Sequence, residues 1–512
     1  MIPELPVTPQ TSLRNMDVGE WEAIDNLTIP EVAIAHKPGF GYVPNQVRRE
    51  WQRATVQIED RRADATTRQQ TQWITRYLKW RLVLPQLLLR GASAGGEQGQ
   101  SEIEERFERW AAGKRYSLVN ELKQEKNQQR AQGKTKWKAQ HKEEKINMVL
   151  DQIALGEISK GQNLLTSLGV ADPDRPEVRR KLQQQHPIRA RPLPIAEEFQ
   201  QNTRVTVKLK TRMRKLKRRK GTGPGGMRNE YLTALAHHAG GDREAERAVQ
   251  CEEAFAAAYL NDELPPWFYY VFTAVKCTPL NKKNRGIRPV AVGESERRLW
   301  WSAALGDIQD NVRRGIAPTQ MAVGAKCASE RLSQTIRTAL ELHPEWVAVK
   351  LDVSNFFNEC LRGRTVHRMM AIPQLATLIP GILAEFHAAS PILLNGEVMG
   401  DTASWEGLQQ GHPVAPALSA AYLLPYLQRA DDTLRSRGGV VRGQMDDVYM
   451  VGPKELVLKA WEQLKKDLTQ PGEGLTLNVG KSAAFTRNTS TEAWLRTQNI
   501  AGDTIPFGME KS

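Results

Sequence analysis

The sequence predicts an α+β protein in which a mainly helical N-terminal region precedes an antiparallel sheet. Apolar residues alternate over 347–351 and end at Asp352, the pattern of a strand that delivers a carboxylate at its end. Two β-rich runs within Gly438–Pro453 indicate a hairpin. A helical pattern runs from about Gln46 to Leu89, and charged amphipathic helix is expected over 101–165. We expect the helices near the sheet to cover one of its faces.

The charge balance favours a polyanionic partner. The 512 residues carry a net charge of +14, and nucleic acid is the commonest such partner, with an anionic membrane surface as the weaker alternative. Residues 201–240 hold eleven Lys or Arg and one Glu, and ten of the seventeen residues of Arg204–Lys220 are basic. Phosphate contact is one interpretation of this run. An exposed helix or a nuclear-localisation patch is the other.

Cysteine usage and hydropathy point to an intracellular protein without a membrane segment. The four cysteines form no C-x-x-C pair and are spaced too widely for a zinc knuckle, so we expect reduced, mostly buried thiols. The first residues show no secretory signal. The longest apolar run, Ala415–Leu427, is too short to span a bilayer.

The N-terminal 200 residues have no evident chemistry. Gly91–Gln100 is a Gly/Ser/Gln-rich linker, and 101–165 is typical of a helical bundle or a solvated arm. Pro173–Pro194 breaks the helical pattern and indicates a boundary. The candidate functional residues all follow residue 200.

Three aspartates form the candidate site. Taken singly, Asp352 is an ordinary strand-end residue, and Asp446-Asp447 is an Asp-rich turn of a common kind. Two like charges fixed at a tight hairpin turn are, however, costly unless a cation lies beside them. With Asp352 on a neighbouring strand, the three would form a hard-oxygen site suited to Mg²⁺, with Mn²⁺ as the alternative. Two ions about 3.5–4 Å apart would activate a primer 3′-hydroxyl and stabilise the leaving pyrophosphate.

A Gly/Pro-rich loop lies between these carboxylates in the sequence. Ser404–Pro416 precedes an apolar, helix-like run over 417–427. The loop either caps that helix or lines a base pair that is being formed. Gln410-Gly411 lets the backbone approach a ligand closely.

The order of these motifs resembles the polymerase palm. A strand ending in Asp, a Q-G-x-P loop and helix, an x-M-D-D hairpin and Gly474–Lys481 are similar in order and spacing to palm motifs A, B, C and D. The version is most similar to the reverse transcriptases of non-LTR retrotransposons. The resemblance covers about residues 204–485. It is supported upstream by Gly221–Leu232, by the hairpin-like Thr278–Val292 and by Gln320–Gly324.

The resemblance implies a role for each matching residue. Asp352, Asp446 and Asp447 would ligate the metal ions, together with the carbonyl of Val353. Gln410 and Gly411 would position the template and the nucleotide. Cationic residues would contact the phosphates of the substrate: Lys283 and Arg288 on the incoming triphosphate, and Lys481 on the pyrophosphate. For Lys481, a surface lysine is the alternative.

Phe357 bears on the choice of substrate. It lies five residues after Asp352, where RNA-dependent RNA polymerases usually carry Asp and reverse transcriptases carry a bulky aromatic residue. A phenylalanine there should exclude the ribose 2′-hydroxyl by a steric clash. The alternative is a core phenylalanine, and we expect one of the pair Phe356 and Phe357 to be core.

The resemblance implies a right-hand polymerase with a fingers-like subdomain at 201–345 and a ferredoxin-like palm at 346–490. A short tail at 491–512 would leave the thumb absent. The implied activity is RNA-templated DNA synthesis with an RNA template, a DNA primer and dNTPs, inside the cell and most naturally in the nucleus. The alternatives are a polymerase-derived, non-catalytic nucleic-acid-binding or scaffold protein and an RNA-dependent RNA polymerase. The chain departs from the pattern at Gln444, where the family usually has an aromatic or apolar residue.

Overall fold

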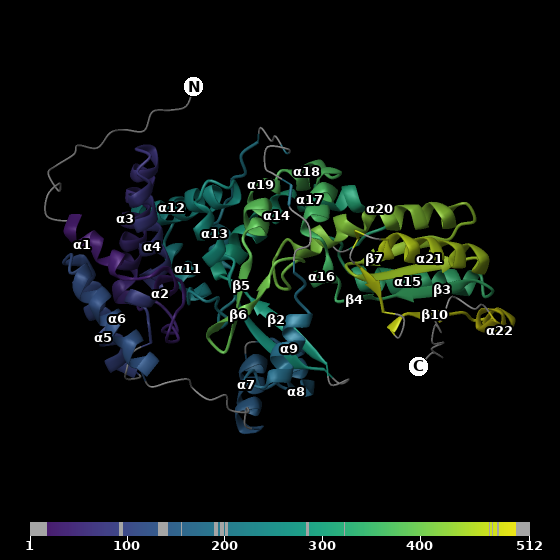
Figure 1. Cartoon of the computed structure of the whole chain (residues 1–512), viewed down its shortest axis with the longest axis horizontal. Helices are drawn as coiled ribbons and strands as arrows, with labels where there is room; N and C mark the ends of the chain where they lie inside the picture. The colour runs from purple at the N-terminus through teal and green to yellow at the C-terminus, as the bar shows by residue number, and fades with distance from the viewer. Residues whose placement is uncertain are drawn as a thin grey trace. The chain divides into compact units, whose positions relative to one another are not determined.

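The expected mixture of helices and sheets is confirmed. The structure is a computed structural model (Figure 1), and it describes residues 18–91, 96–131, 142–154, 156–188, 193–194, 199, 203–282, 286–321, 323–470, 472–473, 475–478 and 481–497. Contacts group the chain into two compact units. Unit 1 comprises Met1–Lys136, Leu209–Phe255 and Glu294–Glu296, and unit 2 comprises Trp137–Lys208, Ala256–Gly293 and Arg297–Ser512. The predicted subdomain limits at residues 200, 345 and 490 stay predictions.

Unit 1 is built from helices around a core of tryptophans. Trp21 lies edge-on to Trp80 and Trp110, with ring centroids 5.5 and 5.7 Å apart. All three rings are buried, and such edge-to-face pairs add to the free energy gained from burial alone. The helices are α1 (Val18–Glu22), α2 (Ile29–Ala33), α3 (Arg48–Thr67), α4 (Thr71–Leu88), α5 (Gly96–Ala111), α6 (Arg115–Ala131), α10 (Lys210–Arg214), α11 (Asn229–Leu235) and the greater part of α12 (Arg243–Leu260).

Unit 2 contains a four-stranded sheet of order β2-β1-β5-β6. The hairpin expected in Thr278–Val292 is confirmed, because β1 pairs antiparallel with β2 and Leu280 lies opposite Arg288. Val178 and Leu182 of helix α9 pack on the same apolar cluster as Val275 of β1. The elements are α9 (Pro176–Gln184), β1 (Val275–Asn281), β2 (Ile287–Val292), β5 (Ser390–Leu394) and β6 (Glu397–Ser404).

A second sheet of unit 2, of order β10-β3-β8-β7, is antiparallel throughout. The predicted strand is β3 (Val347–Leu351), and the predicted hairpin consists of β7 (Val440–Gln444) and β8 (Asp447–Gly452). β10 (Ala483–Phe485) forms the other edge, while the two-residue strands β4 (Val353–Ser354) and β9 (Thr476–Leu477) pair with each other. Segments more than a hundred residues apart in the sequence therefore meet in one sheet.

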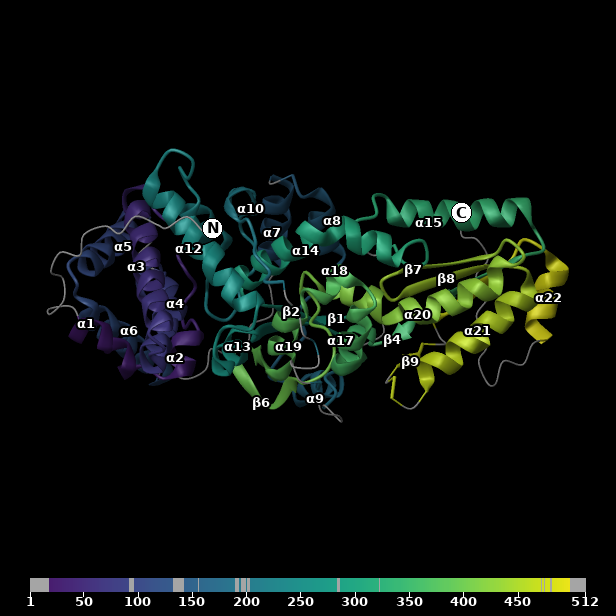
Figure 2. The same cartoon turned by 90° about the horizontal axis from the view of Figure 1, so that it is seen from above.

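Helices cover both faces of this sheet, so the prediction of one covered face is wrong. α20 (Ala415–Arg435) and α21 (Lys454–Thr469) lie on one side and α15 (Ala328–Leu342) on the other (Figure 2). Leu340 of α15 packs on Ala348 and Val451, whose side chains point away from α20 and α21. The strands are thus apolar on both faces at the end where α15 packs, and they become polar on the α15 face only near Asp352.

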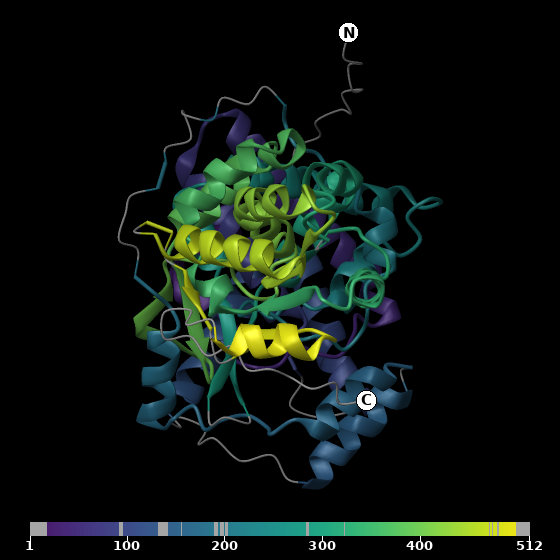
Figure 3. The ribbon, with the colours of Figure 1, turned by 90° about the vertical axis from the view of Figure 1, so that its right-hand side faces the viewer.

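The remaining elements of unit 2 are helical. The C-terminal helix α22, coloured yellow, is seen best in Figure 3. None of the helices that the structure describes is long and apolar enough to cross a bilayer. The four cysteines are free, and all but Cys327 are buried. The helices are α7 (Lys142–Ala154), α8 (Ile158–Thr166), α13 (Pro266–Phe272), α14 (Ser295–Ile316, from Arg297 on), α16 (Phe356–Glu359), α17 (Arg362–Met370), α18 (Pro373–Ala376), α19 (Ile379–His387) and α22 (Thr489–Thr497).

Leu351→Ala tests the central position of β3. Leu351 is fully buried in the strand that ends at Asp352, and truncating such a leucine costs about 2–5 kcal/mol through lost burial and the cavity left behind. We expect a clear fall in the urea midpoint, followed by tryptophan fluorescence. The control is Phe485→Ala on the edge strand β10, where the side chain is 37% exposed. An equal loss in both variants would contradict the central placement of β3.

Candidate functional site

Two strands bring Asp352 and Asp447 together. Leu351 of β3 lies opposite Val448 of β8. Asp352 directly follows Leu351 and Asp447 directly precedes Val448, so the two aspartates adjoin a pair of residues that face each other across the sheet. Together with Asp446 in the adjoining turn, these side chains form what we call the carboxylate corner.

The turn that carries Asp446 is short and strained. Gln444 pairs with Asp447, so Met445 and Asp446 alone connect the strands. Met445 has a φ of 59°, in the left-handed region where a residue with a side chain costs about 1–2 kcal/mol. The pKa of Asp446 is raised, first because burial disfavours the charged form and then through the like charges of Asp447 and Asp352. The three carboxylates are therefore electrostatically coupled.

Lysines neutralise the two outer carboxylates. Lys350 Nζ lies 2.9 Å from Asp447 Oδ1, and Lys481 Nζ lies 3.6 Å from Asp352 Oδ2. Burial lowers the pKa of Lys350, but the hydrogen bond to Asp447 contributes to a net rise. Within the described ranges, no three His, Cys, Asp or Glu side chains are gathered closely enough to hold a metal ion. The oxygen donors at the corner suit Mg²⁺ in kind, and two ammonium groups lie beside them.

Further cations lie near Asp352. The pKa of Lys282 is lowered by burial and by the positive charges of Arg288 and Lys481, while Asp352 raises it. Lys282, Arg288 and Lys481 therefore lie within electrostatic reach of one another or of Asp352, as an anion-binding site requires. Lys283, which the sequence favoured for this role, lies outside the described residues; Lys282 is the neighbouring lysine that the structure describes at this position.

Backbone contacts fix the strand end at Asp352. The amide of Asp352 donates to Ser482 Oγ at 3.2 Å, and its carbonyl accepts from the amide of Asn478 at 2.8 Å. Val353 follows directly, buried, and lies opposite Leu477. The segment that carries Lys481 thus holds the residue with which Lys481 pairs.

The Gly-rich loop lies against the helix that follows Asp352. The amide of Gly407 donates to the carbonyl of Cys360 at 3.0 Å, and a Cβ at Gly407 would stand 2.4 Å from the carbonyl oxygen of Asn358. Gly411 has a φ of 94°, a backbone conformation that favours glycine. Gln410 lines a small pocket beside Pro289 of β2. The loop thus lies between the helix after Asp352 and the β1–β2 hairpin.

The two phenylalanines differ as expected. Phe356 is only 2% exposed and packs edge-on to Tyr422 of α20, so it is the core residue of the pair. Phe357 is half-buried. Both residues lie in helix α16 rather than in a continued strand.

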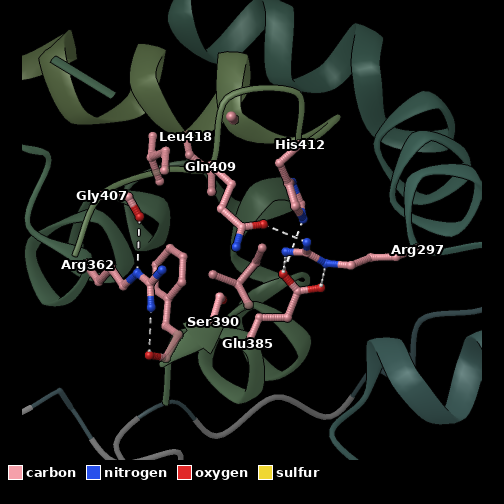
Figure 4. A pocket seen from close by; sticks show the side chains of 12 residues that line it. Arg297, Arg362, Glu385, Ser390, Gly407, Gln409, His412 and Leu418 are labelled. Atoms are coloured by element: carbon pink, nitrogen blue, oxygen red, sulfur yellow. Dashed lines mark hydrogen bonds and ion pairs between the residues drawn. The ribbon is translucent and has the colours of Figure 1, made fainter. Parts of the chain in front are cut away.

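A buried ion cluster anchors the middle of the loop (Figure 4). The Arg297 guanidinium donates through Nε to Glu385 at 2.8 Å and through Nη1 to Gln409 Oε1 at 2.6 Å. Glu385 also accepts hydrogen bonds from Tyr259 and Trp301, each at 2.6 Å. Removing one partner from such a buried cluster is strongly destabilising, so the cluster fixes Gln409, the residue that precedes Gln410.

The sequence missed several residues that the structure places around the corner. Lys350 carried a usable signal, because a residue two before Asp352 in a strand shares its face. Lys282 was not predicted as a phosphate-contacting residue, because the sequence favoured the adjacent Lys283. Gln320 was noted only as part of the Gln320–Gly324 segment. The contacts of Gln320 and Arg297 could not be predicted locally, since their partners lie 125 and 88 positions away, respectively.

Comparison with known proteins gives a distant structural likeness alone. No protein-family model matches the sequence, and no curated protein matches it. Among solved structures, apo telomerase from Candida tropicalis is similar over 42% of this chain at 12% identity, with a TM-score of 0.33. A form of the same protein truncated from the C-terminal domain gives 12% identity and a TM-score of 0.32. The chain spans 45% and 50% of their lengths, respectively. At this level of similarity, function has to be inferred from the residues of this chain.

Asp446→Asn should stabilise the protein at neutral pH. Because the pKa of Asp446 is higher in the folded protein than in the unfolded chain, ionising this carboxyl costs more free energy in the folded state. At pH values above its ordinary pKa, the ionised group therefore lowers the stability of the protein. We expect the variant to melt a few degrees above wild type at pH 7.5 in EDTA, with a smaller difference at pH 4.5. Asp432→Asn on the exposed side of α20 is the control. A lower melting temperature for Asp446→Asn at pH 7.5 would show that the corner is not under charge repulsion.

Proposed function

We propose that the chain is a template-directed nucleotidyltransferase that copies RNA into DNA. The observation that carries the proposal is the coupling of Asp352, Asp446 and Asp447 at one corner of an antiparallel sheet, with Lys282, Arg288 and Lys481 close by. Carboxylates beside cations are what a reaction between a nucleoside triphosphate and a primer hydroxyl requires. In this assignment the second sheet with its helices is the palm, and the β1–β2 hairpin belongs to the fingers.

The carboxylates would hold Mg²⁺ or Mn²⁺, with the carbonyl of Val353 as a further oxygen donor. Bound there, the metal would lower the pKa of the primer 3′-hydroxyl and offset charge on the departing pyrophosphate. Lys350 and Lys481, which pair with Asp447 and Asp352, would have to give up these carboxylates when the metal binds. Lys481 is 61% exposed, so it can turn toward a phosphate at little cost.

The cations would orient the triphosphate. Arg288 offers a planar fork for two phosphate oxygens, whereas Lys282 and Lys481 act as point charges. Lys283 is the further candidate from the same tip of the hairpin. Gln410 and Gly411 would line the nascent base pair, since Gly411 keeps the backbone open to close approach.

The proposed substrates are an RNA template, a DNA primer and dNTPs, with a retroelement of the non-LTR type as the source and the nucleus as the site of action. The basic run Arg204–Lys220 would add contacts to the nucleic-acid backbone. Some of its cations are already engaged: Arg204 donates to Glu263 at 2.7 Å and Arg214 to the carbonyl of Ala236 at 3.1 Å.

One observation favours a second candidate, a non-catalytic nucleic-acid-binding protein derived from a polymerase. The lysine pairs at the corner already neutralise two carboxylates, and the described side chains do not form a ready metal-binding group. If the lysines held their places, the corner would be a structural ion-pair network. Extension of a primer decides between the two candidates.

Primer extension on poly(rA)/oligo(dT) with dTTP and Mg²⁺ or Mn²⁺ tests the proposal. Wild type should incorporate dTTP, and Asp446→Asn should be slower by about 10²- to 10³-fold, the scale of losing one group that stabilises charge in a transition state. Asp432→Asn, remote from the corner, should match wild type. Absence of incorporation by wild type in either metal, with retained binding of the duplex, would favour the second candidate.

Phe357→Val tests the selection of sugar. A smaller side chain should admit the ribose 2′-hydroxyl, so incorporation of UTP relative to dTTP should rise at least about tenfold, the lower end of what one steric contact contributes to selectivity. Phe356→Val in the core is the matched control: it should lower stability without changing the ratio. An unchanged ratio in Phe357→Val would point to an RNA-synthesising enzyme or to a different sugar-contacting residue.

A further inference from the structure

The Met445–Asp446 turn is braced by a segment from outside the hairpin. Gln320 forms an isolated parallel bridge with Gly443 of β7. The amide of Gly443 donates to the carbonyl of Thr319 at 2.6 Å, and the carbonyl of Gly443 accepts from the amide of Met321 at 2.8 Å. Residues 319–321 thus extend the edge of the sheet at the point where the strand enters the turn.

The side chain of Gln320 then reaches the turn itself. Its Nε2 donates to the carbonyl of Met445 at 3.2 Å, and its Oε1 accepts from the amide of Met445 at 3.2 Å. One amide group therefore engages both backbone groups of the residue that precedes Asp446. Gln320 is only 2% exposed, so a side-chain amide that lost these partners would be left buried without them, which is costly.

The neighbouring residues fit this contact. A Cβ at Gly443 would stand 2.8 Å from both Gln320 Nε2 and Leu427 Cδ1, so a residue with a side chain there would crowd the amide from the side that packs on Leu427. Met445 holds its left-handed φ of 59° without being glycine, and such a conformation persists only where its surroundings fix it. Two hydrogen bonds reach the Met445 backbone from outside the hairpin in the part of the chain that the structure describes. Both are made by the side-chain amide of Gln320.

We propose that Gln320 is a positioning residue, which holds the Met445 backbone so that the Asp446 carboxylate stays in the orientation needed to bind a divalent cation. This proposal rests on the proposed function for its purpose, but the clamp itself is a property of the fold. Gln320 touches neither substrate nor cation; it acts through the turn.

Hydrogen exchange of the peptide that contains Met445 tests the clamp without reference to activity. Gln320→Met keeps the length of the side chain and removes both hydrogen bonds, so exchange at Met445 should quicken at least tenfold. Gly443→Ala should do the same by displacing the amide, with Gln320 intact. The control is Gln52→Ala in unit 1, which also removes a buried amide, one that donates to the carbonyls of Ala234 and Leu235; it should leave the Met445 peptide unchanged.

Affinity for Mn²⁺, measured by electron paramagnetic resonance with purified protein, tests the positioning role. Groups that orient metal ligands typically contribute 10- to 100-fold to affinity, so Gln320→Met and Gly443→Ala should bind Mn²⁺ that much more weakly than wild type. Gln52→Ala should keep the wild-type affinity even if its melting temperature falls. In primer extension, the two variants should need more Mg²⁺ for half-maximal rate while the KM for dTTP changes little.

The outcomes separate the two proposals. Unchanged exchange at Met445 in both variants would overturn the clamp, and quicker exchange with unchanged Mn²⁺ affinity would overturn the positioning role. A wild type that binds Mn²⁺ but extends no primer would refute the proposed function while leaving the clamp to be judged by exchange and affinity. Loss of Mn²⁺ binding in Gln52→Ala as well would show a general effect of stability and would also overturn the positioning role.

Discussion

Repulsion between carboxylates at the corner of one sheet is the constraint around which this part of the molecule is arranged. Burial raises the pKa of Asp446, and the like charges of Asp447 and Asp352 raise it further. Lys350 and Lys481 offset part of the repulsion. A divalent cation that bound at the corner would have to displace the ammonium groups of Lys350 and Lys481. Metal binding would therefore be coupled to movement of these two lysines.

The corner keeps its shape because the forces that fix its backbone are independent of the charges. Asp352 is held by hydrogen bonds on both sides of its peptide, and the turn before Asp446 is held by Gln320. The loop that carries Gln410 is held through Gln409 by the buried Arg297–Glu385 cluster. Replacing a charged side chain at the corner should therefore alter electrostatics while leaving the strands in register.

Local patterns in the sequence predicted the strand ending at Asp352 and the Asp446-Asp447 hairpin, because each depends on residues within a few positions. The coverage of the sheet was predicted wrongly, since Ala348 and Val451 do not reveal by themselves that α15 packs on them. The clamp by Gln320 could not be predicted either: a buried glutamine is indistinguishable in sequence from an exposed one, and its partner is 125 residues away.

Gln444 shows how a departure from the expected motif can be accommodated. Its side chain exchanges hydrogen bonds with Ser329, next to the start of α15, at 3.1 and 3.2 Å. An apolar residue at this position could make no such bonds. Polar contacts from Ser329, in the first turn of α15, and from Gln320 hold the end of β7 and the turn that follows it. Because hydrogen bonds are directional, these contacts give the end of β7 and the turn a defined geometry with a polar residue at position 444.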